Sequence, residues 1–274
     1  MRYLRKDFLL IAILWLPAIL FGYCYVITYS VNVPYWDMWD TVVLWVLKFH
    51  SSELTLVDFF RIYNDGRLTF PIILSLPILV LSSLNVKVFY VVGFTLYLVG
   101  ILFLLFLLRK DSKLNYFAFA FLSAPILYYA LNPNFLVRYI SNLGAFTAPV
   151  ILLFAFLTVH FLFKAKKSNK YLGSAILTGF ASSFSGAPGF SIWFAGLLQL
   201  LIQKMDKKWT KIAVWCVSAF LVFFVHFWVL GRPPFYSPNP ESRHSYDAYL
   251  IYIKTALFYP LHKFSCFLCV LGSE

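Results

Sequence analysis

Two carboxylates three positions apart, Asp37 and Asp40, are the first residues in this sequence whose types and spacing could do chemistry. Their oxygens can hold a divalent cation, Mg²⁺ or Mn²⁺. One of them can instead act as a general base, with its pKa raised by the other and by partial burial. The structural alternative makes Asp37 the N-cap of a helix that begins at Met38, with Asp40 near the positive end of the helix dipole.

Aromatic side chains and an isolated cation in this sequence could bind a substrate near the two acids. Trp36 and Trp39 flank the two acids, and such aromatics favour contact with sugars or lipids at a membrane surface. Arg138 is the only Lys, Arg, Asp or Glu in residues 114–163, and asparagines precede and follow it. A guanidinium in that setting is a candidate ligand for phosphate oxygens, the alternative being an anchor at the membrane interface.

A second polar motif, Asn64-Asp65-Gly66-Arg67, follows shortly after the acids. It predicts a turn with Gly66 in the left-handed conformation. Arg67 then stands where the chain becomes apolar again. It can snorkel to the membrane interface or form a planar fork for a phosphate, and the sequence leaves both readings open.

The rest of the chain is apolar enough to hold these residues in a membrane. Its 274 residues are 61% hydrophobic and 12% charged, and the net charge is +12. The basic residues cluster between hydrophobic runs, which excludes nucleic-acid binding as the reason for the charge and favours cytoplasmic loops. The four cysteines form no disulfide framework. The runs are Phe8–Tyr29, Leu68–Leu84, Val86–Leu108, Asn115–Leu131, Thr147–Phe163, Tyr171–Ser185, Phe190–Gln203, Ile212–Leu230 and Tyr249–Leu271.

We therefore expect an all-α polytopic protein, with residues 1–274 as a single transmembrane domain of about eight spans. Four basic clusters hold 14 of the 23 Lys and Arg. They are Arg2/Arg5/Lys6, Arg109/Lys110/Lys113, Lys164/Lys166/Lys167/Lys170 and Lys204/Lys207/Lys208/Lys211. A cytoplasmic N-terminus, in the plasma or inner membrane, places all four clusters inside only if one early run does not span. The short, Pro-containing run Leu68–Leu84 is that segment.

This topology puts two polar loops on the extracytoplasmic side. Residues 231–248 are rich in proline and predict irregular structure. Residues 32–70 carry five of the chain's 11 acidic residues. Within them, Met38–His50 and Leu54–Tyr63 have helical apolar periodicity but are too polar to span, so they are expected to lie in the membrane interface. In the first of these helices, one apolar face is expected to hold Trp39, Val42, Val43 and Val46.

The arrangement resembles the GT-C superfamily of membrane glycosyltransferases, which includes protein O-mannosyltransferases and aminoarabinose transferases. In that superfamily a first transmembrane helix precedes a large extracytoplasmic loop with an acidic motif and surface helices. The matching stretches here are residues 34–40, the motif ending at Arg67, and the Ser/Gly turn that leads into a Trp-containing helix at Ser183–Leu198. The spacing of Asp37 and Asp40 departs from the adjacent acids of several families. The chain is also short, as a truncated member would be.

The resemblance implies transfer of a sugar from a polyprenyl-phosphate donor to an extracytoplasmic lipid, glycan or protein. It implies Asp37 as base and Asp40 as its partner or metal ligand. Substrate-binding roles are expected for Arg67, Arg138, Asn64, Asp65, Trp36 and Trp39. Membrane lipids are expected partners. The alternative function is a non-enzymatic membrane protein, such as a flippase for lipid-linked sugars or a small transporter.

Overall fold

The computed structural model describes the backbone of residues 2–34, 38–63, 66–111, 114–139 and 144–230. The chain divides into two compact units, Met1–Pro233 and Pro234–Glu274, and every helix described here belongs to the first. The expected span Tyr249–Leu271 and the Pro-rich loop at residues 231–248 therefore lie outside the described residues.

The described part is helical, as expected, apart from one hairpin of two-residue strands. The helices are α1 (Arg2–Tyr29), α2 (Leu44–His50), α3 (Leu56–Phe59), α4 (Thr69–Leu81), α5 (Val86–Asp111), α6 (Tyr116–Ala130), α7 (Pro133–Tyr139), α8 (Gly144–Lys164), α9 (Asn169–Ser183), α10 (Ser191–Ile202) and α11 (Lys208–Phe224). Two π-helices, η2 (Trp39–Val43) and η4 (Val225–Val229), adjoin α2 and α11. A 3-10 turn, η3 (Ala187–Phe190), precedes α10.

The expected number of about eight spans is not supported. Within the described residues, 4 segments are long and apolar enough to cross a membrane: Ile11–Tyr29, Val86–Lys110, Gly144–Lys164 and Lys208–Val229. The runs expected at α6, α9 and α10 form helices of only 15, 15 and 12 residues. At about 1.5 Å per residue these are shorter than the roughly 30 Å hydrocarbon core. Hydropathy measures how apolar a run is, whereas spanning also requires a continuous helix.

A first hydrophobic core joins α1, α2, α4, α5, α6 and the beginning of α8. Its centre is aromatic, with Phe89, Phe94 and Phe146 fully buried. The Asn32 side chain, just after α1, accepts a hydrogen bond from the Val86 backbone N–H at 2.7 Å. This bond satisfies a donor at the start of α5 that has no partner within the helix, so the polar loop begins by capping the central helix of this core.

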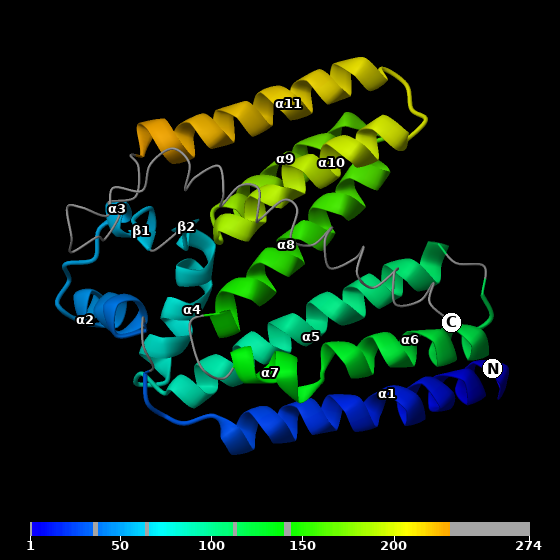
Figure 1. Cartoon of the computed structure of the whole chain (residues 1–274), viewed down its shortest axis with the longest axis horizontal. Helices are drawn as coiled ribbons and strands as arrows, with labels where there is room; N and C mark the ends of the chain where they lie inside the picture. Colours follow the sequence, from blue (N-terminus) through cyan, green and yellow to red (C-terminus); the bar gives the residue numbers. More distant parts are fainter. Residues whose placement is uncertain (1, 35–37, 64–65, 112–113, 140–143, 231–274) are drawn as a thin grey trace, which may run out of the picture. The chain divides into compact units, whose positions relative to one another are not determined.

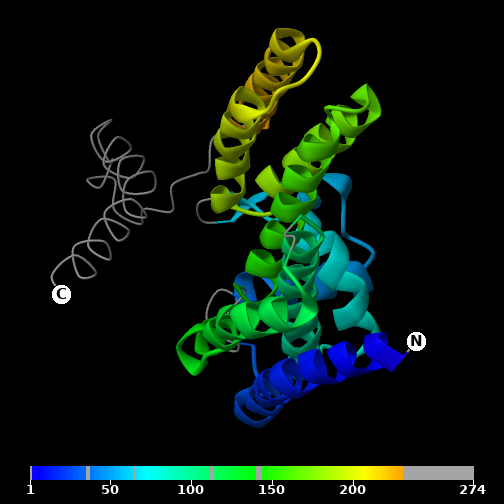
Figure 2. The ribbon, with the colours of Figure 1, turned by 90° about the vertical axis from the view of Figure 1, so that its right-hand side faces the viewer.

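A second core joins the end of α8 to α9, α10 and α11. The indole rings of Trp193 and Trp215 pack with centroids 4.5 Å apart. The Trp193 indole N–H donates to the Ser183 hydroxyl at 2.8 Å, and the Trp215 indole N–H donates to the Trp193 carbonyl at 2.9 Å. Both polar tips are thus satisfied inside the core. In Figures 1 and 2 these helices gather beside the far half of α8, away from α1.

Helix α8 belongs to both cores and runs parallel to α5. Gly93 approaches the start of α8 so closely that a Cβ there would lie 2.2 Å from the Ala145 carbonyl oxygen. Further along, the Phe103 and His160 rings are 5.7 Å apart. Only glycine at position 93 permits the two backbones to come this near.

The helix directions bring the basic clusters toward one end. Helix α1 runs antiparallel to α5, since the Tyr23 and Thr95 hydroxyls are 3.0 Å apart and Asn32 caps the start of α5. Helix α11 runs antiparallel to α8, with Lys211 at the end of α8. The start of α1, the ends of α5 and α8 and the start of α11 therefore point one way, opposite to the polar loop (Figure 1). Helix α4 has 13 residues, too few for a span. Which membrane face each end occupies stays a prediction.

Candidate functional site

The described parts of the polar loop, residues 32–34, 38–63 and 66–70, are anchored to the first core. Met38 is fully buried and its sulfur accepts a hydrogen bond from the Tyr90 hydroxyl of α5 at 3.3 Å. The Trp45 indole N–H donates to the Tyr63 hydroxyl at 2.5 Å, with the two rings edge to face. Thr69 donates to the Phe59 carbonyl at 2.7 Å. These bonds fix both ends of the loop and its middle.

The first expected surface helix is largely confirmed. It begins as the π-helix η2 and continues as α2 to His50. Val42, Val43 and Val46 are buried together, as their spacing predicted. Trp39 was expected on the same face, and this prediction is wrong: 54% of the residue is exposed. Trp39 is the first residue of η2. A π-helix has about 4.4 rather than 3.6 residues per turn because its bonds run from i to i+5, so positions 39 and 42 lie farther apart around the axis than in an α-helix.

The second expected surface helix, Leu54–Tyr63, is wrong in most of its length. Only Leu56–Phe59 is helical, and Ile62–Tyr63 is strand β1. The helix starts with a capping box, in which the Asp58 carboxylate accepts from the Thr55 backbone N–H at 2.9 Å. It stops because the carbonyls of Phe59 and Phe60 are taken by Thr69 and Arg67 instead of by residues further along a helix.

The two candidate acids fall at the edge of what is described. The backbone of Asp40 is the second residue of η2. Asp37 and Trp36 lie outside the described residues. The N-cap position belongs to Met38, one residue later than predicted, within the usual uncertainty of a helix boundary. Among the described side chains no three potential metal ligands gather, but the side chains of Asp37 and Asp40 are not among them.

The described part of the loop contains one ion pair, which its sequence did not predict. The Lys48 ammonium lies 2.5 Å from an Asp58 carboxylate oxygen and joins α2 to α3. This hydrogen bond, together with those from Thr55, lowers the pKa of Asp58 from 3.8 to about 2. Asp58 is therefore a structural carboxylate that stays ionised at neutral pH, and it is not a candidate base. The spacing Thr55-x-x-Asp58 was the sequence signal for it.

Arg67 is a buried link and not a snorkelling side chain. It lies in strand β2 (Gly66–Arg67), which pairs antiparallel with β1, and only 2% of it is exposed. Its guanidinium donates to the Phe60 carbonyl, to the His226 carbonyl at 2.9 Å and to the Leu230 carbonyl at 3.0 Å. Burial lowers the pKa of Arg67 from its ordinary value, although a guanidinium remains protonated near neutral pH. A phosphate would have to displace these carbonyls. Asn64 and Asp65 lie outside the described residues.

Two stretches singled out in the sequence meet beside Arg67. A Cβ at Gly66 would lie 2.8 Å from the Ala187 backbone nitrogen, so the hairpin touches the Ser/Gly turn before α10. His226, in the π-helix η4 that follows α11, is buried between the rings of Phe184 and Phe190, whose centroids lie 5.3 and 4.7 Å away. Its Nδ1 has no hydrogen-bond partner among the described residues. The sequence motifs are thus neighbours in space.

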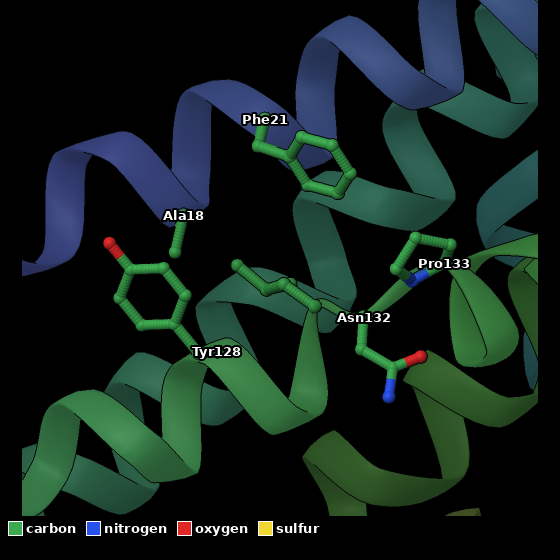
Figure 3. Close-up of a pocket in the computed structure, with 6 residues that line it drawn as sticks. Ala18, Phe21, Tyr128, Asn132 and Pro133 are labelled. Atoms are coloured by element: carbon green, nitrogen blue, oxygen red, sulfur yellow. The ribbon is translucent and has the colours of Figure 1, made fainter.

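Arg138 lies on a different element, in α7, and its side chain is not described. The same helix borders a groove of about 300 Å³ between α1 and the end of α6 (Figure 3). Ala18, Phe21, Tyr128, Leu131, Asn132 and Pro133 line this groove. Asn132 was noted only as a neighbour of Arg138, and the other lining residues carry no polar pattern that would have marked them in the sequence.

Comparison with known proteins adds little to this geometry. No model of a known protein family matches the chain, and no solved structure matches it. An uncharacterized protein from Archaeoglobus fulgidus is 85% identical over 54 residues, which are 19% of this chain and 14% of that protein. The chain is therefore similar to a short piece of that relative, whose description states no activity.

Proposed function

We propose that the protein is a membrane glycosyltransferase of the GT-C type, which moves a sugar from a polyprenyl-phosphate donor to an extracytoplasmic acceptor. The observation that carries the proposal is the folded polar loop. The segment that holds Asp37 and Asp40 follows a helix long enough to span, and it is anchored at Met38 to Tyr90 of the central helix. Asp40 lies in a π-helix, a feature frequent at functional sites.

The proposed reaction needs few groups. A carboxylate, Asp37, removes the proton from the acceptor hydroxyl as that oxygen attacks the anomeric carbon of the sugar. The bond from this carbon to the phosphate oxygen breaks, and the polyprenyl phosphate leaves with the electron pair. A phosphate leaves without protonation, so positive charge near it replaces a general acid. Asp40 supports the base or holds Mg²⁺ or Mn²⁺, and Arg138 binds the phosphate.

Arg67 has a different part in this proposal from the one its sequence suggested. Its guanidinium donates to three backbone carbonyls that come from the polar loop and from the end of α11. It therefore positions the hairpin, and Arg138 is the better phosphate ligand. The contact between Gly66 and Ala187 also supports the proposal, because it brings together two stretches that carry the resemblance.

The test is transfer by the purified full chain in liposomes that contain a polyprenyl-phosphate-linked sugar. Lipids and glycans from cells with and without the gene first identify the sugar and the acceptor. Release of polyprenyl phosphate together with a glycosylated acceptor is the expected result. Movement of the intact lipid-linked sugar between leaflets, with no new glycosidic bond, would instead assign the protein to the flippases.

A further inference from the structure

Two loops at the end of the second core carry an unusual density of positive charge. Residues 164–170 and 204–211 contain eight lysines and a single acid, Asp206. We call the seven lysines of these loops other than Lys211 the lysine plate. They are Lys164, Lys166, Lys167, Lys170, Lys204, Lys207 and Lys208.

The eighth lysine joins the two loops into one surface. Lys211 is buried, with 6% of it exposed, and its ammonium donates to the Ala165 carbonyl at 2.8 Å. This bond ties the first turn of α11 to the loop that follows α8. Nearby, the Gln199 amide donates to the Val159 carbonyl at 3.0 Å and holds α10 against α8. The lysine plate is therefore a fixed part of the fold and not two independent loops.

No acid in the described part of the chain forms an ion pair with the plate. The one ion pair among the described residues, Lys48–Asp58, lies at the opposite end of the helices. The ammonium of Lys166 instead lies 4.3 Å from the Phe163 ring centroid, and that of Lys164 lies 5.4 Å from the Tyr171 ring centroid. Lys166, Lys167, Lys170, Lys204 and Lys207 are all exposed.

Apolar side chains are interleaved with these lysines at the ends of the long helices. One candidate span ends at Lys164 and another begins at Lys208. Beside them, Trp209 is 74% exposed and Ile202 is 82% exposed. Exposed tryptophan and lysine at the end of a span are typical of the depth where lipid headgroups meet the hydrocarbon. A soluble acidic protein or a nucleic acid would leave these apolar side chains in water.

We propose that the lysine plate binds the phosphate headgroups of anionic lipids, with the apolar side chains in the adjoining hydrocarbon. Lysines attract phosphate as point charges, and several together favour an anionic lipid over a zwitterionic one. Each lysine close to an anionic surface contributes about fivefold in affinity, and salt weakens the attraction. This binding site is separate from the proposed transfer site, because the polar loop lies at the other end of the helices.

The test counts lipids bound to the purified full chain. The protein in detergent receives equal amounts of dioleoylphosphatidylglycerol and dioleoylphosphatidylcholine, and native mass spectrometry counts the retained molecules of each. The wild-type chain should prefer phosphatidylglycerol, and the preference should fall as salt rises. Replacing Lys166, Lys167, Lys170 and Lys204 by Gln should reduce it at least tenfold. Replacing the same four by Arg should preserve it.

A pair of exposed cations at the opposite end supplies the matched control. Arg61→Gln with Lys87→Gln removes as much charge as Lys167→Gln with Lys204→Gln, but only the second pair lies in the plate. Unchanged melting temperatures show that all variants are folded. Equal loss of lipid preference in both double variants would overturn the proposal, as would a wild-type chain that retains the two lipids equally.

Discussion

The two cores of this protein are built from different kinds of residue. The first packs large aromatic rings, and polar side chains of the loop at residues 32–70 close its end. The second depends on glycine and serine, which let helices approach until only a pair of indole rings fits between them. Side-chain hydrogen bonds hold the polar loop against the first core. Polar residues that could take part in a reaction can therefore lie at the surface of this core. The second is a compact support whose exposed end carries lysines.

The largest expected difference between the two ends is their accessibility from outside the cell, which should be complete at one end and absent at the other. We expect single cysteines at positions 87 and 142 to react with an impermeant reagent in intact cells, and those at 110 and 167 not to react. The physical reason is the positive-inside rule, which assigns the end with the basic clusters to the cytoplasm. The background lacks the native cysteines. Labelling at 110 without labelling at 142 would reverse the assignment of the two ends.

The next effect concerns the acids of the first region. Asp37→Asn should lower the transfer rate by about 10²–10⁴, because a general base is lost, and Asp40→Asn should be severely impaired. If Asp37 is only a helix cap, the cost is about 1 kcal/mol of stability and activity remains. Transfer rates and melting temperatures in detergent separate these outcomes. Glu53→Gln is the control, an exposed acid of the same loop that should behave as wild type.

Glycine substitutions test the close packing of the second region. A Cβ at Gly189 would lie 1.8 Å from the Ser182 carbonyl oxygen, so Gly189→Ala forces backbone movement. We expect it to cost about 3 kcal/mol or more in the free energy of unfolding. At Gly173 nothing lies within 4 Å of the new methyl group, so Gly173→Ala should stabilise α9 by up to about 1 kcal/mol. Denaturant titration of both variants measures the contrast, and equal effects would refute the packing argument.

Arg67 connects the polar loop of the first region to the end of α11. Arg67→Ala leaves three carbonyls without their donor, and we expect a loss of about 2–3 kcal/mol in stability. Arg67→Lys keeps the charge but not the planar fork, so it should recover only part of this loss. Thermal unfolding gives the comparison, with the exposed Arg61→Ala as control. A stable but inactive Arg67→Ala would restore the phosphate-binding role first expected for this residue.

The smallest effect is a pH dependence at Asp58. Its pKa is about 2 in the folded chain against 3.8 ordinarily, so its ionised form stabilises the fold above about pH 4. That contribution is lost as the pH falls from there toward 2. Asp58→Asn should cost about 1 kcal/mol at neutral pH, as loss of a cap does, and flatten the stability profile in that window. An Asp58→Asn variant that keeps the wild-type slope in this window would contradict this account.

Much of the fold follows from the sequence, because basic clusters and apolar runs reflect how a chain partitions between water and lipid. The lengths of α6, α9 and α10 could not be predicted in the same way. In α9, for example, the run stays apolar on average despite its Gly and Ser residues. The helix nevertheless ends at Ser183, because the backbone of Phe184 leaves the helical conformation. Hydropathy averaged over a window of residues does not show where a helix ends.

The candidate site was less predictable than the fold. The segment around Asp37 stood out because acids are scarce in this chain. The partners of Arg67 did not, since the His226 and Leu230 carbonyls lie 159 and 163 residues away and every residue carries a carbonyl. Long-range bonds to backbone atoms leave no signature in side-chain types. The Lys48–Asp58 pair was missed although it joins two charged side chains only 10 residues apart and the capping box at Thr55 was readable.

The contact of Gly93 with the Ala145 carbonyl has a mechanical consequence. Pro149 lies inside α8 and has no N–H to donate to that carbonyl four residues earlier. The freed oxygen therefore faces α5, and α8 is at its softest where it crosses that helix. A bend at this point would swing the later half of α8, which carries His160, relative to Phe103 of α5. The contact at Gly93 would serve as the pivot of such a bend, and the lysine end of α8 would move farthest.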